Sequence, residues 1–423
     1  MEGYTLLKFL HLADVHLDTS FYSKNENLRK KLRDGIRKSF SKAVDLCIDE
    51  KVQGLLIAGD LFDNDRLSFK TEQFLIREFC RLKDNNIKVF YATGNHDPGH
   101  MSYRVNSIKW PDNVYLFKDN EIKRVNIKDF NGETLGRIIS CGHRTNNDSK
   151  NLVKAFPQRE GKIPHIGLVH TMVTNVRDSE NHNRYLPCSK EDLESKNYDY
   201  WALGHIHKRL KVSDRCDIYY PGNIQGRHPR ETGKKGGLLV SIDENCDVKV
   251  EFRTLSTIEW HSININGLED IKEYSQLKKY ISNIISDYIK ENSLLSRELV
   301  LRVELEGRAF LKAELSLQEN LEEIVEELTL DMDLLELEIK VDRLVGRIDG
   351  EDYKGGNHVL ALVLEVLRDI GEDEEILNRL LEIPLLKKGI GKREEKIAYI
   401  RELLGGIDEE AVGYMVGDRY EDK

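Results

Sequence analysis

Residues 9–18 have the sequence FLHLADVHLD, in which an apolar run ends at two potential metal ligands, Asp14 and His16. The run predicts a β-strand over residues 6–13. Side chains two positions apart in an extended chain lie on the same side of it. The spacing therefore predicts that Asp14 and His16 face one site at the end of the first strand.

Similar apolar runs recur through the first 257 residues. They predict strands at residues 54–58, 88–92, 137–141, 166–169, 200–203 and 237–242. Between them, apolar residues at helical spacing predict helices at residues 35–49 and 69–83. This alternation of strands and helices is typical of an α/β domain.

Polar residues directly follow several of these strands. In chain order they are Asp14, Asp60, Asn95-His96-Asp97, His170 and His205. Open α/β sheets place their ligand sites at the carboxyl ends of the strands. We therefore expect these side chains to meet at one edge of the fold.

Seven side chains in and near these clusters carry the donor atoms of a two-metal site. They are Asp14, His16, Asp60, Asn95, His170, His205 and His207. Carboxylate, amide and imidazole ligands without thiolate suit a pair of Mn, Fe or Zn ions, and we favour two Mn²⁺ ions. A carboxylate has enough oxygens to bind two cations about 3.5–4 Å apart, so Asp60 is expected to bridge them. We assign Asp14, His16 and His207 to one cation, and Asn95, His170 and His205 to the other.

The chemistry expected of such a site is hydrolysis of a phosphoester. Two cations lower the pKa of a shared water and stabilise charge on the phosphate oxygens. His96 follows the ligand Asn95 and is expected to contact the phosphate or to protonate the leaving oxygen. Asp97 is expected to hydrogen-bond His96 and hold it cationic. The sequence thus predicts His96 and Asp97 as a catalytic pair.

The chain divides by charge into two halves of opposite sign. Residues 1–257 hold 42 Lys and Arg against 35 Asp and Glu, a net charge of +7, and residues 258–423 hold 22 against 39, a net charge of −17. A basic half suits an approach to polyanions. Four residues near the last ligands are predicted phosphate contacts: Lys208, Arg209, Arg227 and His228.

The acidic half predicts two further parts. Helices at 269–291 and 316–328 alternate with strands at 298–306 and 334–342, which indicates a small α/β domain over residues 258–350. Residues 351–423 have helical patterns throughout. The predicted domains are therefore residues 1–257, 258–350 and 351–423.

Two features bear on the location of the protein. No stretch approaches the roughly 20 apolar residues of a membrane span, and no signal peptide is visible at the N-terminus. The six cysteines lie far apart and form no C-x-x-C pair. These features predict a cytoplasmic protein that does not contact the membrane.

The ligand motifs resemble those of the calcineurin-like metallophosphoesterases. The family pattern D-x-H, G-D, G-N-H-[DE], H and G-H-x-H is matched by Asp14–His16, Gly59-Asp60, Gly94–Asp97, His170 and Gly204–His207. The resemblance implies a four-layer α/β/β/α sandwich holding two metals.

Within that superfamily the chain is similar to the SbcD-type DNA repair nucleases, and most of all to their YhaO branch. The similarity lies in FLHLADVHLD, in GDLFD at 59–63, and in YPGNIQGRH at 220–228 followed by Glu231 and Lys235-Gly236. Some relatives have a His where this chain has Asp63. This difference at residue 63 bears on whether end processing and strand choice are the same as in those relatives.

The resemblance implies a Mn-dependent enzyme with exonuclease action on double-stranded DNA and endonuclease action on single strands. It further implies a homodimer, a capping domain behind the catalytic core, and C-terminal helices that dock an SbcC-like coiled-coil ATPase. Two alternatives stay open. One is a metal-dependent phosphatase or small-molecule phosphodiesterase with the same metals, and the other is a scaffold whose site no longer works.

Overall fold

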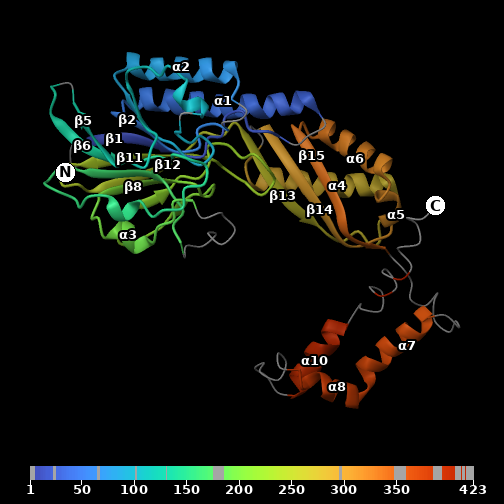
Figure 1. Ribbon diagram of the computed structural model, residues 1–423. Coiled ribbons are helices and arrows are strands. Elements are labelled where there is room, and N and C mark those ends of the chain that lie inside the picture. Colours follow the sequence, from blue (N-terminus) through green and yellow to red (C-terminus); the bar gives the residue numbers. More distant parts are fainter. Residues whose placement is uncertain are drawn as a thin grey trace. The chain divides into compact units, whose positions relative to one another are not determined.

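A computed structural model shows the fold of the chain (Figure 1). The structure describes residues 5–21, 25–63, 67–100, 102–129, 131–174, 185–294, 298–346, 359–383, 393–404, 411 and 415. These residues belong to two compact units. The first comprises Met1–Ser262 and Ser296–Leu301, and the second comprises Ile263–Leu295 and Arg302–Lys423.

Two six-stranded sheets form the centre of the first unit. The order of the first sheet is β12 (Val248–Thr254), β11 (Gly236–Asp243), β1 (Thr5–Leu12), β2 (Gly54–Ala58), β3 (Lys88–Ala92), β4 (Val114–Phe117). The order of the second is β5 (Lys123–Lys128), β6 (Thr134–Ser140), β7 (His165–His170), β8 (Tyr200–Gly204), β10 (Ile218–Tyr220), β9 (Leu210–Lys211). β1 to β4 are mutually parallel, as are β6, β7, β8 and β10, so their carboxyl ends gather at one edge of each sheet.

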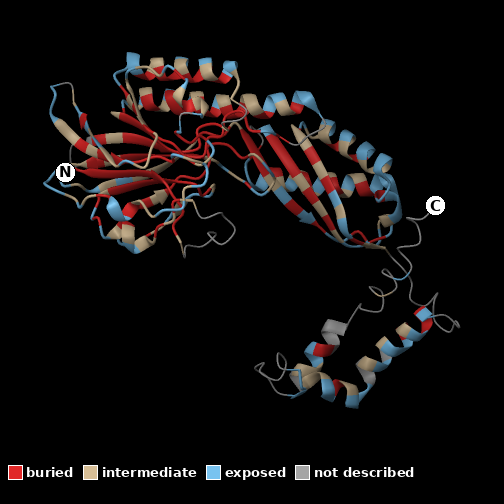
Figure 2. Ribbon diagram, viewed as in Figure 1, coloured by how far each residue is buried: buried red, intermediate tan, exposed pale blue. Residues whose placement is uncertain are grey.

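The two sheets pack face to face through an apolar core. Phe9 and Phe90 of the first sheet lie in one buried cluster with Ile138, Ile166 and Tyr200 of the second. The rings of Phe9 and Tyr200 meet edge to face at 5.4 Å. Burial is densest along these strands in Figure 2. Removing this apolar surface from water is the main stabilisation of the sandwich.

Helices cover the two outer faces. α1 (Glu26–Asp49) and α2 (Phe69–Asp84) lie together over the first sheet, where Phe40 contacts both Phe74 and Phe79 (Figure 1). α3 (Lys190–Glu194) and the short 3-10 helix η3 (Val153–Ala155) pack on the second sheet, and η2 (Arg104–Asn106) follows β3. The predicted α/β/β/α sandwich is therefore confirmed.

α1 begins nine residues before the predicted start at residue 35. The Asn25 side chain caps it by accepting a hydrogen bond from the Leu28 amide. Leu28 and Leu32 then continue the buried face toward the N-terminus. The prediction missed this segment because its many charged residues dilute the apolar pattern.

In the second unit, the described residues form most of a smaller sheet and six helices. Its strands are ordered β13 (Ile258–Ile265), β14 (Glu298–Ala309), β15 (Glu336–Gly346), and β13 begins within the first unit. The helices are α4 (Tyr274–Glu291), α5 (Lys312–Leu315), α6 (Gln318–Asp331), α7 (Val359–Glu372), α8 (Glu374–Leu381) and α10 (Arg393–Leu404). None of the helices among the described residues is long and apolar enough to cross a membrane.

The division into units differs slightly from the predicted domains. The structure keeps residues 258–262 with the first unit, whereas the predicted boundary follows residue 257. It also assigns residues 351–423 to the second unit rather than to a third. A separate C-terminal helical region therefore stays a prediction.

Candidate metal centre

All seven predicted metal ligands lie at the carboxyl ends of five strands in the two sheets. Asp14 and His16 follow β1, Asp60 follows β2, Asn95 follows β3, His170 ends β7, and His205 and His207 follow β8. The parallel strands bring them to one edge, as the sequence predicts.

Small residues allow the two sheets to approach closely at this edge. A Cβ on Gly204 of β8 would lie 1.8 Å from the carbonyl oxygen of Ala58 in β2. Within the first sheet, a Cβ on Gly94 after β3 would lie 2.2 Å from Oδ1 of Asp60 after β2. Only glycine fits at these two positions, because any side chain would push the strand ends apart.

The backbone carrying the ligands is not extended, which corrects one step of the prediction. Asp14, His16 and Asp60 have φ angles of 51°, 49° and 53°, in the left-handed region that non-glycine residues seldom adopt. The His16 amide donates to the Asp60 carbonyl at 2.9 Å, which ties the two turns together. Asp14 and His16 do face one site, but through left-handed turns rather than through strand alternation. Such conformations cluster at functional sites.

The side chains converge around Asp60. His16 Nε2 lies 3.7 Å from Asp60 Oδ2, and His170 Nε2 lies 3.4 Å from the same oxygen. His170 Nε2 is also 3.0 Å from Asn95 Oδ1. Asp14, Asp60 and His170 place one donor atom each within 4.8 Å of one another. Asp60 thus lies between His16 and His170, where a bridging carboxylate belongs.

The remaining predicted ligands complete the cluster on both sides. His207 Nε2 lies 3.7 Å from Asp14 Oδ1, and His16 joins these two within 4.8 Å. The His205 ring lies 5.2 Å from the His170 ring, and the His205 amide donates to the Asp14 carboxylate. Asp14, His16 and His207 thus lie together, while the division of the seven ligands between two cations stays a prediction.

Hydrogen bonds on the far side of three imidazoles direct their Nε2 atoms into the cluster. His16 Nδ1 bonds Asp63 at 2.9 Å, His170 Nδ1 bonds the Ala58 carbonyl at 2.9 Å, and His207 Nδ1 bonds Glu231 at 2.7 Å. Histidines that bind metals are held in this way, with the outer N–H on a carboxylate or carbonyl. His16 Nε2 is buried and has no hydrogen-bond partner among the described residues. That atom lacks a partner that a metal ion would supply.

Electrostatics favour cations in the same place. Burial lowers the pKa of His170 to about 4, and it lowers the pKa of His207 to about 3 although the hydrogen bond to Glu231 opposes the shift. Both imidazoles are therefore neutral near pH 7, which is the form that binds metals. Burial and the nearby Asp60 raise the pKa of Asp14. Two buried carboxylates beside neutral imidazoles require compensating positive charge.

Asp97 does not pair with His96, so this predicted contact is wrong. Its buried carboxylate accepts hydrogen bonds from the amides of Leu61 and Gly94, both at 2.6 Å, and from the hydroxyl of Tyr91. Burial raises its pKa to about 7. The side chain folds back onto its own loop, where it fixes the turns carrying Asp60 and Asn95.

Asp63 takes the place predicted for Asp97. Its Oδ1 lies 3.0 Å from His96 Nδ1 and 2.9 Å from His16 Nδ1. Burial lowers the pKa of His96, but the hydrogen bond to Asp63 and the negative charges of Asp60 and Asp63 together raise it to about 9. Asp63 lies in the GDLFD motif at residues 59–63, yet the motif alone does not indicate which histidines it contacts.

The four predicted phosphate contacts lie in different surroundings. Arg227 reaches the centre, with Nη2 at 3.1 Å from His207 Nδ1, and His228 lies at its rim with Nε2 at 3.4 Å from Glu231. Lys208 is exposed. Arg209 stacks its guanidinium over the ring of Phe252 at 4.1 Å, which is a packing contact in the structure.

Glu231 is a residue whose role the sequence analysis did not assign. Besides His207, it accepts hydrogen bonds from the Asn223 side chain at 2.7 Å and from the Arg227 amide at 2.8 Å. Its place three residues after the YPGNIQGRH segment is the signal that could have marked it. The long-range bond to His207 is visible only in the fold.

Replacing Glu231 with glutamine is expected to weaken Mn²⁺ binding about 10- to 100-fold, because the outer bond orienting His207 loses its charge. Isothermal titration with MnCl₂ measures the change. Glu244→Gln, at an exposed position in the same unit, is the matched control. Equal affinity in the Glu231 variant and the wild type would remove Glu231 from the metal centre.

The sequence of the chain is also similar to those of known proteins. A calcineurin-like phosphoesterase family profile matches residues 7–209. The chain is 33% identical over 304 residues to the uncharacterized metallophosphoesterase YhaO of Bacillus subtilis, covering 70% of this chain and 72% of that protein.

Archaeal relatives are more distant. The DNA double-strand break repair protein Mre11 of Sulfolobus acidocaldarius is 25% identical over 328 residues, covering 71% of this chain and 75% of that protein. Mre11 of Methanocaldococcus jannaschii is 28% identical over 284 residues, covering 63% and 72%.

The matched segment contains every strand end that contributes to the cluster, from Asp14 to His207. The sandwich, the converging ligands and the extent of the similarity to YhaO agree with one another. This chain belongs to the calcineurin-like phosphoesterase family, whose members use a dinuclear metal centre.

Proposed function

We propose that the protein is a metal-dependent DNA nuclease of the SbcD type, in its YhaO branch. It acts as an exonuclease on double-stranded DNA and as an endonuclease on single strands. The observation that carries the proposal is the cluster around Asp60, which has the ligands for two cations. The similarity to Mre11 proteins, named for DNA double-strand break repair, supports DNA as the substrate.

The proposal assigns each ligand to one of two cations, most simply Mn²⁺. Asp14, His16 and His207 would hold one, Asn95, His170 and His205 would hold the other, and Asp60 would serve both. A cation pair held by these residues would supply an activated water and positive charge for the phosphate oxygens.

The chain's own side chains then act on the substrate. His96, with its pKa of about 9, is protonated near pH 7 and can donate a proton to the leaving oxygen. Asp63 orients His96 through the 3.0 Å bond. Arg227 lies beside His207, where its guanidinium can bind a phosphate oxygen.

The partner is proposed to be an SbcC-like coiled-coil ATPase, bound in the cytoplasm by a homodimer of this chain. Support comes from α7, which exposes Val359, Leu362 and Val366 at 67%, 61% and 56%. These residues follow a helical spacing, so they form an apolar face suited to a partner helix.

The deciding experiment compares substrates. With MnCl₂, the purified chain is expected to degrade linear duplex DNA and to cut circular single-stranded DNA. EDTA should stop both reactions. p-Nitrophenyl phosphate, a phosphomonoester, serves as the test of a phosphatase. Turnover of the monoester without any cleavage of DNA would refute the nuclease and leave the phosphatase.

Removing residues 352–423 is expected to preserve Mn²⁺-dependent cleavage of single strands and to abolish co-purification with the ATPase, because the metal centre lies in the first unit. The double variant Leu362→Ser/Val366→Ser in the full chain should lose the partner as well. Glu365→Gln, an exposed polar position on the same helix, is its control. Undiminished co-purification of the double variant would exclude this face of α7 as the docking site.

A further inference from the structure

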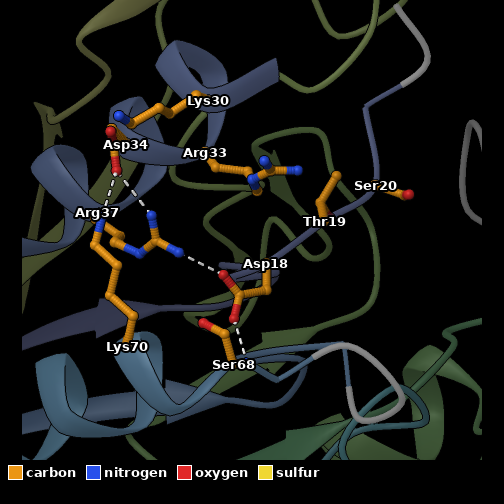
Figure 3. Close-up of a pocket in the computed structure, with 9 residues that line it drawn as sticks. All are labelled: Asp18, Thr19, Ser20, Lys30, Arg33, Asp34, Arg37, Ser68 and Lys70. Atoms are coloured by element: carbon orange, nitrogen blue, oxygen red, sulfur yellow. Dashed lines mark hydrogen bonds and ion pairs between the residues drawn. The ribbon is translucent and has the colours of Figure 1, made fainter. Parts of the chain in front are cut away.

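A polar pocket lies beside the metal centre in the first unit (Figure 3). Its volume is about 600 Å³, within the range of about 300–1,000 Å³ that ligand pockets usually have. Nine residues from the segment after β1, from α1 and from the start of α2 line it: Asp18, Thr19, Ser20, Lys30, Arg33, Asp34, Arg37, Ser68 and Lys70.

Thr19 links this pocket to the metal centre. Its hydroxyl donates to Asp63 at 3.0 Å and accepts from Arg227 at 3.3 Å. Asp63 in turn contacts His16 and His96. Thr19 therefore lines the pocket and also bonds two residues that contact the ligand histidines.

The two carboxylates of the pocket are already neutralised. Arg37 pairs with Asp18 and, at 2.8 Å, with Asp34. Asp18 also accepts hydrogen bonds from the Ser68 amide at 2.7 Å and the Thr71 hydroxyl at 2.8 Å. Lys70 lies 3.4 Å from Asp34. Figure 3 shows the contacts among Asp18, Asp34, Arg37, Ser68 and Lys70.

Two cationic side chains remain in excess. Neither Lys30 nor Arg33 has a hydrogen bond or ion pair with any other residue that the structure describes, and in Figure 3 no dashed line reaches them. Both lie on α1, one turn apart. With Asp18 and Asp34 balanced by Arg37 and Lys70, the pocket has a surplus of two positive charges and favours an anion.

The side chains that line the pocket indicate which kind of anion it binds. None of the nine lining residues is aromatic, so the pocket offers no aromatic ring on which a base could stack. A guanidinium and an ammonium together suit the oxygens of a phosphate group. The pocket thus fits the backbone of a nucleic acid rather than its bases.

We propose that this pocket binds a backbone phosphate of the DNA strand that is being cut, next to the phosphate at the metal centre. The inference rests on the proposed nuclease function and adds a binding site to it. Lys30 and Arg33 contact the phosphate, and Arg37 holds the pocket in shape. A contact of this kind positions the strand without regard to sequence.

The test measures binding of a fluorescein-labelled oligothymidylate to the full chain by fluorescence anisotropy, in EDTA and over a series of KCl concentrations. The variant Lys30→Gln/Arg33→Gln is expected to bind about tenfold more weakly. The slope of log Kd against log [KCl] should fall by about one, because one phosphate contact is lost.

Lys38→Gln/Lys42→Gln is the matched control, since it removes two exposed cations from the same helix outside the pocket. It should change Kd less than about twofold. Equal weakening in both variants, or wild-type binding in the pocket variant, would overturn the inference.

Cleavage of the same oligonucleotide by the wild type with MnCl₂ separates the two proposals. If the wild type cuts it while the pocket variant binds as tightly as the wild type, only the phosphate pocket is refuted. If the wild type hydrolyses bis(p-nitrophenyl) phosphate but no DNA, the nuclease function fails and the pocket proposal fails with it.

Discussion

Replacing Asp60 with asparagine is expected to lower the rate of Mn²⁺-dependent hydrolysis by at least about 10³-fold. Asp60 is buried and lies within 4 Å of both His16 and His170. An amide has similar shape, but it carries no charge to offset two cations. We therefore expect the variant to bind at most one Mn²⁺ ion.

Three measurements check this expectation. Initial rates give the loss of hydrolysis, and metal analysis of the dialysed protein gives the number of bound ions. Thermal unfolding gives the third, because an ion that binds only the folded protein raises Tm. MnCl₂ should raise the Tm of the wild type and of Asp112→Asn, a control at an exposed position, far more than that of Asp60→Asn. Two tightly bound ions in Asp60→Asn would contradict a bridging role.

The sequence predicts well which strands carry the site residues, because local runs of apolar residues reveal the strands. The predicted bounds of β2 and β3 agree with the structure, and the residues after each strand reach the common edge. Parallel pairing makes this outcome general, since it aligns the carboxyl ends of neighbouring strands. Asp14 and His207 follow strands of different sheets, so their convergence also requires the two sheets to pack face to face.

Contacts around the ligands are much less accessible from sequence. Adjacency along the chain suggested that Asp97 supports His96, yet Asp97 turns back to the Gly94 amide, and Asp63 takes that place. Glu231 meets His207 only because the segment after β10 returns to the centre. Such bonds depend on where loops close in space, and no periodicity in the sequence encodes that.

Strands β9, β10 and β12 were not predicted from the sequence, for a related reason. β9 and β10 have two and three residues, too few to show a pattern. β12 has a mixed sequence, VKVEFRT, and lies at the edge of its sheet. Their position is decided by pairing with neighbours rather than by their own residues.

Replacing His96 with alanine is expected to slow cleavage of DNA about 10²- to 10⁴-fold while both metal ions stay bound. His96 Nδ1 is engaged with Asp63, and its side chain is 48% exposed, on the open side of the cluster. The seven ligands remain in this variant. Titration with MnCl₂ should therefore give the stoichiometry of the wild type, and loss of both ions would show that His96 holds metal.

Substrates with different leaving groups distinguish proton donation by His96 from its other possible roles. The 3′ or 5′ oxygen of a nucleotide is a poor leaving group and needs a proton, whereas p-nitrophenolate departs without one. The His96→Ala variant should thus lose far less activity toward bis(p-nitrophenyl) phosphate than toward DNA. Asp63→Asn should show the same selectivity in weaker form, because it removes the charge that keeps His96 protonated. Equal losses on both substrates would mean that His96 binds the phosphate instead of protonating the leaving oxygen.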